Sequence, residues 1–193
     1  MEFRDVVRKR RMVRRFRRDP VDREAIERIA AAAHEGPSAG YSQGISVVVV
    51  TDAVTRQGIA GLAGEEAWAA RGHWPWLSAA PAHLVLCVEP GTYRRRYSEP
   101  DKDLATLDIP WWWVDGGAAL QLMLMAAVEE GLGAGFLGAQ DLDGLGALLG
   151  IPDDVLVVGI VTVGHPLPDQ PAGSARRGRR PSADVTHHER WGG

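Results

Sequence analysis

The sequence predicts an α+β fold in one domain, and three observations lead to that prediction. The chain has 193 residues, 45% of them hydrophobic, which suits one large domain with its own core. Some segments carry apolar residues at helical spacing, whereas others are short runs rich in valine, which are typical of buried strands. Helical and strand segments follow one another along residues 1–193 without an internal repeat, so a mixed architecture is expected.

Two helices are expected before the first strand. The apolar side chains of residues 3–16 lie on changing faces, which predicts a first helix that gives way to a basic turn. Asp22 can cap a second helix, and Gly36 followed by Pro37 stops it.

Four strands and three further helices are expected in the rest of the chain. The predicted strands cover residues 45–51, 83–88, 134–138 and 157–163, and the predicted helices lie near residues 55–63, 114–130 and 142–149. The segment 114–130 is apolar on nearly all sides, so it is expected to be the longest and most buried helix. Residues 71–109 carry several prolines and aromatic residues, which predicts an excursion of loops and short helices of the kind that often roofs a site.

The composition argues against several classes of protein. The basic N-terminus lacks the apolar segment of a secretory signal, so a cytoplasmic protein is expected. The most apolar window, residues 118–128, is too short to span a bilayer. The six histidines form no HxxxH or HExxH pair, so no metal site is predicted. The single cysteine, Cys87, lies in an apolar run and is interpreted as a core residue.

The residues GAGFLG at 133–138 match the pattern GxGxxG of dinucleotide-binding turns. In a Rossmann fold this motif follows a strand and opens a helix. Here it follows the long apolar helix and is itself the predicted strand, so a Rossmann site is not expected.

Positive charge is concentrated at the two ends of the chain. Nine of the 22 lysines and arginines lie within residues 1–18 and four arginines within residues 176–180, whereas residues 19–175 carry 8 basic and 21 acidic side chains. The cationic ends repel each other unless an anion lies between them. Three interpretations are open: a phosphate clamp, a patch for nucleic acid or membrane, and a solvated surface. Apolar residues within the N-terminal cluster would anchor it to a core, which a nucleic-acid tail does not need.

Five motifs in a fixed order resemble a known family. An RRxxRxF turn at residues 10–16 is followed by PSAGYSQ at 37–43, GLGAGFLG at 131–138, IPDD with VVGIVTVGHP at 151–166, and RRGRRP at 176–181. By composition alone, PSAGYSQ is an ordinary polar loop. Taken together over nearly the whole chain, the motifs resemble the FMN-dependent nitroreductase family, and in particular its short single-domain bacterial members.

The resemblance implies an intertwined α+β homodimer with a central, mainly antiparallel sheet flanked by helices. It implies FMN at both subunit interfaces, NAD(P)H as co-substrate, and a C-terminal segment, residues 172–193, that embraces the partner and reaches the phosphate. The residues implied to contact FMN are Arg10, Arg11, Met12 and Arg14 at the phosphate and ribityl chain, Pro37, Ser38, Ala39, Tyr41 and Gln43 in the polar loop, Leu137, Gly138 and Ala139 along the ring, and Arg177 and Arg179 near the C-terminus. Ser38, Ala39 and Gln43 are implied to serve the flavin bound by the other subunit.

Three residues depart from the family pattern. Met12 stands where a serine is usual, which removes a hydroxyl contact and leaves more of the binding to the arginines. Tyr41 replaces a common asparagine and Gly44 a common proline. An aromatic ring at position 41 suits either stacking on a substrate or filling a pocket.

The resemblance also implies a reaction in which NAD(P)H delivers a hydride to flavin N5 and a flat acceptor, such as a nitroaromatic or a quinone, then takes the electrons. The candidates for the wall of the acceptor pocket are Tyr41, Trp74, Trp76, Trp111, Trp112 and Trp113, and the tryptophans suit a dimer core equally well. Alternatives within the family are dehalogenation, ring oxidation and flavin cleavage. Alternatives outside it are a non-catalytic FMN-binding protein and a binder of nucleic acid or anionic surfaces.

Overall fold

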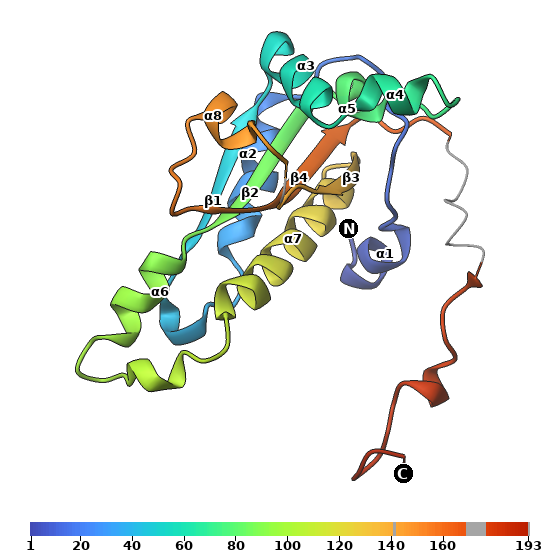
Figure 1. Ribbon diagram of the computed structural model, residues 1–193. Coiled ribbons are helices and arrows are strands. Elements are labelled where there is room, and N and C mark those ends of the chain that lie inside the picture. Colours follow the sequence, from blue (N-terminus) through green and yellow to red (C-terminus); the bar gives the residue numbers. More distant parts are fainter. Residues whose placement is uncertain (141, 169–176, 193) are drawn as a thin grey trace.

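A four-stranded sheet forms the centre of the computed structural model, which describes residues 1–140, 142–168 and 177–192 (Figure 1). The strands are β1 (Ile45–Val50), β2 (Ala82–Val88), β3 (Gly133–Gly138) and β4 (Leu156–Gly164). They lie in the order β1-β2-β4-β3, and every neighbouring pair is antiparallel. The predictions of four strands and of an antiparallel sheet in an α+β fold are therefore confirmed.

Helices cover both faces of this sheet (Figure 1). The α-helices are α1 (Phe3–Lys9), α2 (Arg23–Ala31), α3 (Ala53–Leu62), α4 (Glu65–Ala69), α5 (Trp76–Ala79), α6 (Pro90–Tyr97), α7 (Trp111–Glu129) and α8 (Leu145–Leu149), and the 3₁₀ helices are η1 (Ala32–His34), η2 (Ala39–Tyr41), η3 (Leu104–Thr106) and η5 (Ser182–Asp184). On one face α2, η1 and α7 pack against Leu84 and Leu86 of β2, and on the other α3 and α8 pack against Val85 and Cys87. Because both faces are covered, all seven residues of β2 are buried.

Local sequence signals set the helix ends. Asp22 is the N-cap of α2, and its carboxylate accepts a hydrogen bond of 3.1 Å from the backbone N–H of Ala25. The longest helix, α7, starts at Trp111, earlier than predicted, so the three tryptophans form its first turn. Gly131, with a φ of 72°, follows its end.

The range 71–109, predicted as an excursion, is divided in two by the strand that was predicted at residues 83–88. The range contains β2, which lies inside the sheet. Two separate segments remain: α5 leads into β2, whereas α6 and η3 follow β2 and connect it to α7. The helix predicted at residues 142–149 is also shorter, since α8 begins only at Leu145.

The chain between α1 and α2 lies along the free edge of β3. Met12 pairs with Ala134 in a parallel bridge, and the backbone N–H of Val13 donates to the carbonyl of Ala134 at 2.8 Å. A Cβ added at Gly135 would lie 2.4 Å from the carbonyl oxygen of Val13, so only glycine permits this approach. The GAGFLG motif is thus a strand that a neighbouring segment crosses, which confirms that it is not a dinucleotide-binding turn.

The C-terminal segment 177–192 stands clear of the sheet and its helices (Figure 1). Within it, the guanidinium of Arg180 donates to the carbonyl of Asp184 at 2.6 Å. Trp191, near the end of the segment, is 91% exposed. An indole this exposed is available to another surface.

Candidate functional site

Three arginines of the predicted cofactor site lie on the segment of residues 10–16, named here the cationic segment. Arg10 and Arg14 are half-buried and Arg11 is exposed. The guanidinium carbon of Arg14 lies 5.6 Å from the ring centre of Trp76, a cation–π contact. Neither Arg10 nor Arg11 forms an ion pair or a side-chain hydrogen bond with any of the described residues. The segment therefore offers positive charge to an anion.

Apolar side chains fix the cationic segment to the body. Val13 and Phe16, which are 3% and 1% exposed, pack with Ala80 and against Trp76. Met12 is half-buried against the core cluster that includes α7. The side chain of Met12 thus contributes packing at a position where a serine would contribute a hydrogen bond.

The end of β3 forms the second part of the predicted site. Leu137 is half-buried, Gly138 is exposed, and Ala139 is 4% exposed. These residues share a sheet edge with the cationic segment, which meets the same strand at Ala134. From Ala134 to Gly138 an extended strand advances about 13 Å. An elongated ligand with an anionic end can therefore contact both parts of the site.

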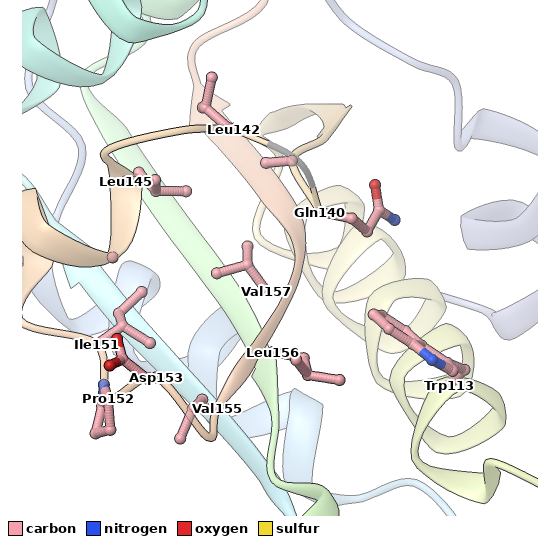
Figure 2. Close-up of a pocket in the computed structure, with 12 residues that line it drawn as sticks. Trp113, Gln140, Leu142, Leu145, Ile151, Pro152, Asp153, Val155, Leu156 and Val157 are labelled. Carbon is pink, nitrogen blue, oxygen red and sulfur yellow. The ribbon is translucent and has the colours of Figure 1, made fainter.

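A pocket of about 390 Å³ opens beside the end of β3 (Figure 2). Trp113 of α7 and Gln140 lie on one side of it and residues 151–153 on the other, with Leu156 and Val157 between them. Most of the lining is apolar. Trp113 was predicted from the sequence, whereas Gln140 was not, although its place directly after the GAGFLG strand was a usable signal.

The polar loop (residues 37–43) has an unusual backbone conformation. Gly40, Tyr41 and Gln43 have φ angles of 62°, 57° and 56°. For a tyrosine or a glutamine this left-handed region costs on the order of 1–3 kcal/mol. The backbone N–H of Gln43 donates to Ser38 Oγ at 2.7 Å and closes the loop. The side chain of Tyr41 is 75% exposed, so the loop presents an aromatic ring to its surroundings.

Two buried side chains tie the polar loop to α6 and α7. The carboxylate of Asp115, 6% exposed, accepts hydrogen bonds from the N–H of Ala39 at 2.9 Å and from the hydroxyl of Tyr93 at 2.7 Å. Burial, and then the bond to Asp115, raise the pKa of Tyr93 above its ordinary value. Neither residue was predicted from the sequence as part of the site, although a lone carboxylate inside an apolar helix segment was a signal for Asp115.

The cationic segment and the polar loop belong to opposite edges of the sheet. The cationic segment lies on β3, the polar loop leads into β1, and these are the two outer strands. Three strand spacings separate the two edges by about 14 Å. One chain thus brings Arg10, Arg11 and Arg14 to the edge that ends in residues 137–139, but it does not bring the polar loop there.

The five tryptophans do not form one wall within a chain. Trp74 and Trp76 lie beside the cationic segment, where the guanidinium carbon of Arg15 is 4.6 Å from the ring centre of Trp74. The other three begin α7, where the ring of Trp112 meets that of Tyr93 edge-on at 6.0 Å. Within one subunit the tryptophans thus fall into two groups, and their part in an acceptor pocket or a dimer core stays a prediction.

Arg177 and Arg179 do not join the N-terminal arginines within one chain. Both are exposed, on the segment that stands clear of the body (Figure 1). The clamp expected from the two chain ends is thus not formed inside a single subunit. Residues 172–176 of the predicted C-terminal segment include Arg176 and lie outside the described residues.

Two other features are absent from the part of the chain that the structure describes. The described residues contain no group of three or more His, Cys, Asp or Glu side chains arranged to hold a metal ion. In the same part of the chain, no helix has both the length and the apolar character that crossing a membrane requires.

Sequence comparison places the chain among known proteins. The Nitroreductase family model matches residues 7–165. A protein of Archaeoglobus fulgidus with the provisional name NADH dehydrogenase/NAD(P)H nitroreductase is 29% identical over 186 residues, 94% of each chain. The NADPH-flavin oxidoreductase of Vibrio harveyi is 29% identical over 161 residues, which cover 81% of this chain and 62% of that protein.

Solved structures agree with this placement. B. megaterium NfrA1 matches with a TM-score of 0.76 at 25% identity, over 98% of this chain and 75% of its own. The NADPH:FMN oxidoreductase from Vibrio harveyi, solved with NAD⁺, matches with a TM-score of 0.73 at 25% identity, over 97% of this chain and 77% of its own. The resemblance read from the motifs is confirmed, and this chain belongs to the nitroreductase family of oxidoreductases.

Proposed function

We propose that this protein is an FMN-dependent NAD(P)H oxidoreductase that reduces a flat acceptor such as a nitroaromatic or a quinone. The observation that carries the proposal is the pair Arg10 and Arg11, which have no acidic partner among the described residues and lie on a segment fixed to the edge of β3. Among the relatives, the Vibrio harveyi enzyme is an NADPH-flavin oxidoreductase.

The residues present fit a flavin mononucleotide. Guanidinium groups bind phosphate oxygens through paired hydrogen bonds, so Arg10 and Arg11 suit the phosphate, with Arg14 beside them. Met12 offers no hydroxyl to the phosphate, so the positive charge of the arginines dominates the binding of the phosphate. At the other end of the edge, Gly138 is exposed and has no side chain, which lets a flat ring approach the backbone.

Two subunits are needed to complete this site. The cationic segment and the polar loop lie on opposite edges of the sheet, with β2 and β4 between them, so a flavin that lies along the β3 edge does not reach the polar loop of the same chain. A homodimer solves this if Ser38, Ala39 and Gln43 of each subunit contact the flavin held by the arginines of the other. The C-terminal segment, with an exposed Trp191 and two exposed arginines, suits a role in embracing the partner.

When bound, FMN supplies the redox chemistry, taking a hydride from NAD(P)H and passing two electrons to the acceptor. The protein's own contribution is binding, orientation and exclusion of water. The arginines fix one end of the cofactor, and the backbone at Gly138 and Ala139 fixes the position of its flat end. The pocket beside them, lined by Trp113 and Leu156, has an apolar surface and enough room for a flat acceptor.

The experiment that tests the proposal is the visible absorption spectrum of the purified protein, followed by anaerobic addition of NADPH and then of NADH. We expect a flavin spectrum that bleaches with a nicotinamide and returns when a nitroaromatic or a quinone is added. Protein that remains colourless after incubation with FMN and removal of the excess would contradict the proposal. Bound flavin that neither nicotinamide reduces would instead indicate an FMN-binding protein without turnover.

A further inference from the structure

The polar loop needs support from outside itself. Tyr41 and Gln43 occupy the left-handed region at φ angles of 57° and 56°, which side chains other than glycine disfavour. The bond from the N–H of Gln43 to Ser38 closes the loop but does not attach it to the body. Attachment comes from α6 and α7, through buried and half-buried side chains.

Asp115 makes the most buried of these attachments. Its Oδ2 atom accepts both the N–H of Ala39 and the hydroxyl of Tyr93, at 2.9 and 2.7 Å. The residue is 6% exposed, and no Lys, Arg or His of the described residues forms an ion pair with it. A buried carboxylate without a counter-ion depends on its hydrogen-bond donors, so the carboxylate and the backbone of Ala39 hold each other in place.

Tyr93 fixes the carboxylate from the side of α6. The ring is 0% exposed and meets Trp112 edge-on. It also occupies the space beside Gly44, where an added Cβ would lie 2.5 Å from Tyr93 Cε2. Glycine at position 44, where the family commonly has proline, thus makes room for the ring whose hydroxyl reaches Asp115.

We infer that Asp115 and Tyr93 are positioning residues that hold the polar loop in the conformation in which it contacts the flavin of the other subunit. The inference rests on the proposed function. Neither residue touches the flavin itself. Both act through the backbone of Ala39, and so on the placement of Ser38 and Gln43.

Four single substitutions test the inference. Asp115→Asn removes the charge and Tyr93→Phe removes the hydroxyl, each with little change of shape. Glu65→Gln is the matched control for the first, because Glu65 is also a buried carboxylate, 8% exposed, that accepts backbone N–H groups, those of Leu77 and Ser78 before β2. Tyr97→Phe is the control for the second, because its ring packs on Gly40 from the same helix but its hydroxyl is not bonded to Asp115.

Two measurements on flavin-free protein decide the outcome: the dissociation constant for FMN, from fluorescence titration, and the hydrogen exchange of the amides of residues 39–44. We expect Asp115→Asn to weaken FMN binding about tenfold and Tyr93→Phe several-fold, with faster amide exchange in both. Glu65→Gln should lower the thermal stability about as much as Asp115→Asn does, while it keeps the parental FMN affinity. Tyr97→Phe should keep both the parental FMN affinity and the parental amide exchange. A parental FMN affinity or parental loop exchange in Asp115→Asn would overturn the inference.

The same experiment separates this inference from the proposed function. If the parent protein itself binds no FMN, the proposed function fails, and exchange of the loop amides still decides whether Asp115 and Tyr93 hold the loop. If Asp115→Asn does not fold, Tyr93→Phe against Tyr97→Phe gives the answer, because removing one hydroxyl leaves the carboxylate and the packing in place. Equal affinity and equal exchange in these two variants would then overturn it.

Discussion

His83 is a buried titratable residue, and its surroundings keep it neutral. It is 0% exposed, and its Nε2–H donates to the carbonyl of Leu77 at 2.8 Å. Its Nδ1 atom has no hydrogen-bond partner among the described residues. Burial lowers the pKa of His83 from 6.5 to about 4, and the nearby charge of Arg56 acts in the same direction. The folded protein therefore resists protonation at this site.

We expect the free energy of unfolding to fall as the pH decreases from 6.5 to 4. His83 of the unfolded chain takes up a proton near pH 6.5, whereas in the folded chain it does so only near pH 4, so protons favour the unfolded state in this range. The contribution is complete above pH 6.5, and its loss reaches about 3 kcal/mol at the acid end. Urea unfolding between pH 7 and 4 measures it. His83→Gln, which retains a donor for Leu77, should show a flatter profile, and parallel profiles would contradict the assignment.

Arg10 is the residue at which the phosphate assignment can be tested. We expect Arg10→Ala to raise the dissociation constant for FMN about tenfold or more, because it removes a charge-assisted hydrogen bond. Thermal unfolding of the flavin-free protein should change little, since Arg10 forms no side-chain hydrogen bond or ion pair with the described residues. Arg18→Ala is the matched control, because Arg18 is exposed and lies beyond the anchored segment. Equal weakening by both variants would indicate general electrostatic attraction and not a phosphate site.

At the scale of the elements, β3 can hold the cationic segment because its glycines leave the edge bare. A Cβ added at Gly133 would lie 2.9 Å from Val13 Cγ2, and one at Gly135 would lie 2.4 Å from the Val13 carbonyl oxygen. The first clash is with a side chain, which can rotate, whereas the second is with backbone. Position 135 is therefore the one that decides whether the cationic segment can pack on β3.

We expect Gly135→Ala to lower the free energy of unfolding by about 2 kcal/mol or more, because the backbone of the cationic segment has to move away. FMN binding should weaken as well, since the same segment carries Arg10 and Arg14. Gly61→Ala in α3 is the control: its added Cβ meets open space, and the change should stabilise the protein by up to about 1 kcal/mol. Denaturant unfolding and FMN titration measure both effects. Parental values for Gly135→Ala would mean that the segment does not lie on β3 as described.

At the scale of the whole molecule, the separation of the two sheet edges makes it possible to test whether each FMN site is built from two chains. We expect a mixed dimer of one Arg10→Ala chain and one Gln43→Ala chain to bind about one FMN tightly, because one of its two sites is built from unaltered parts of both chains. Each homodimer of these variants has two impaired sites. Two different affinity tags on co-expressed chains isolate the mixed dimer, and its flavin absorbance gives the content. If each site belonged to a single chain, the mixed dimer would bind FMN no better than the homodimers.

The positions of the strands and of several helices, and the family, follow from local patterns in the chain. The valine-rich runs, the Asp22 cap and the glycine after α7 are local signals that act within a few residues, so they could be read without a structure. The arginines of the cationic segment and the GAGFLG strand were likewise visible as motifs. The range 71–109 was harder to assign, because the strand predicted at residues 83–88 lies inside a stretch that is otherwise rich in proline and aromatic residues.

The way in which these parts combine depends on contacts between residues that are far apart in the chain. The bond from Ala39 to Asp115 joins residues 76 positions apart, and the bond from Tyr93 to Asp115 joins residues 22 apart. The strand order β1-β2-β4-β3 places the cationic segment and the polar loop on opposite edges, and this is the reason that we propose a site shared by two subunits. Local propensity and spacing carry no information on such pairings, because they depend on which distant surfaces bury one another when the whole chain folds.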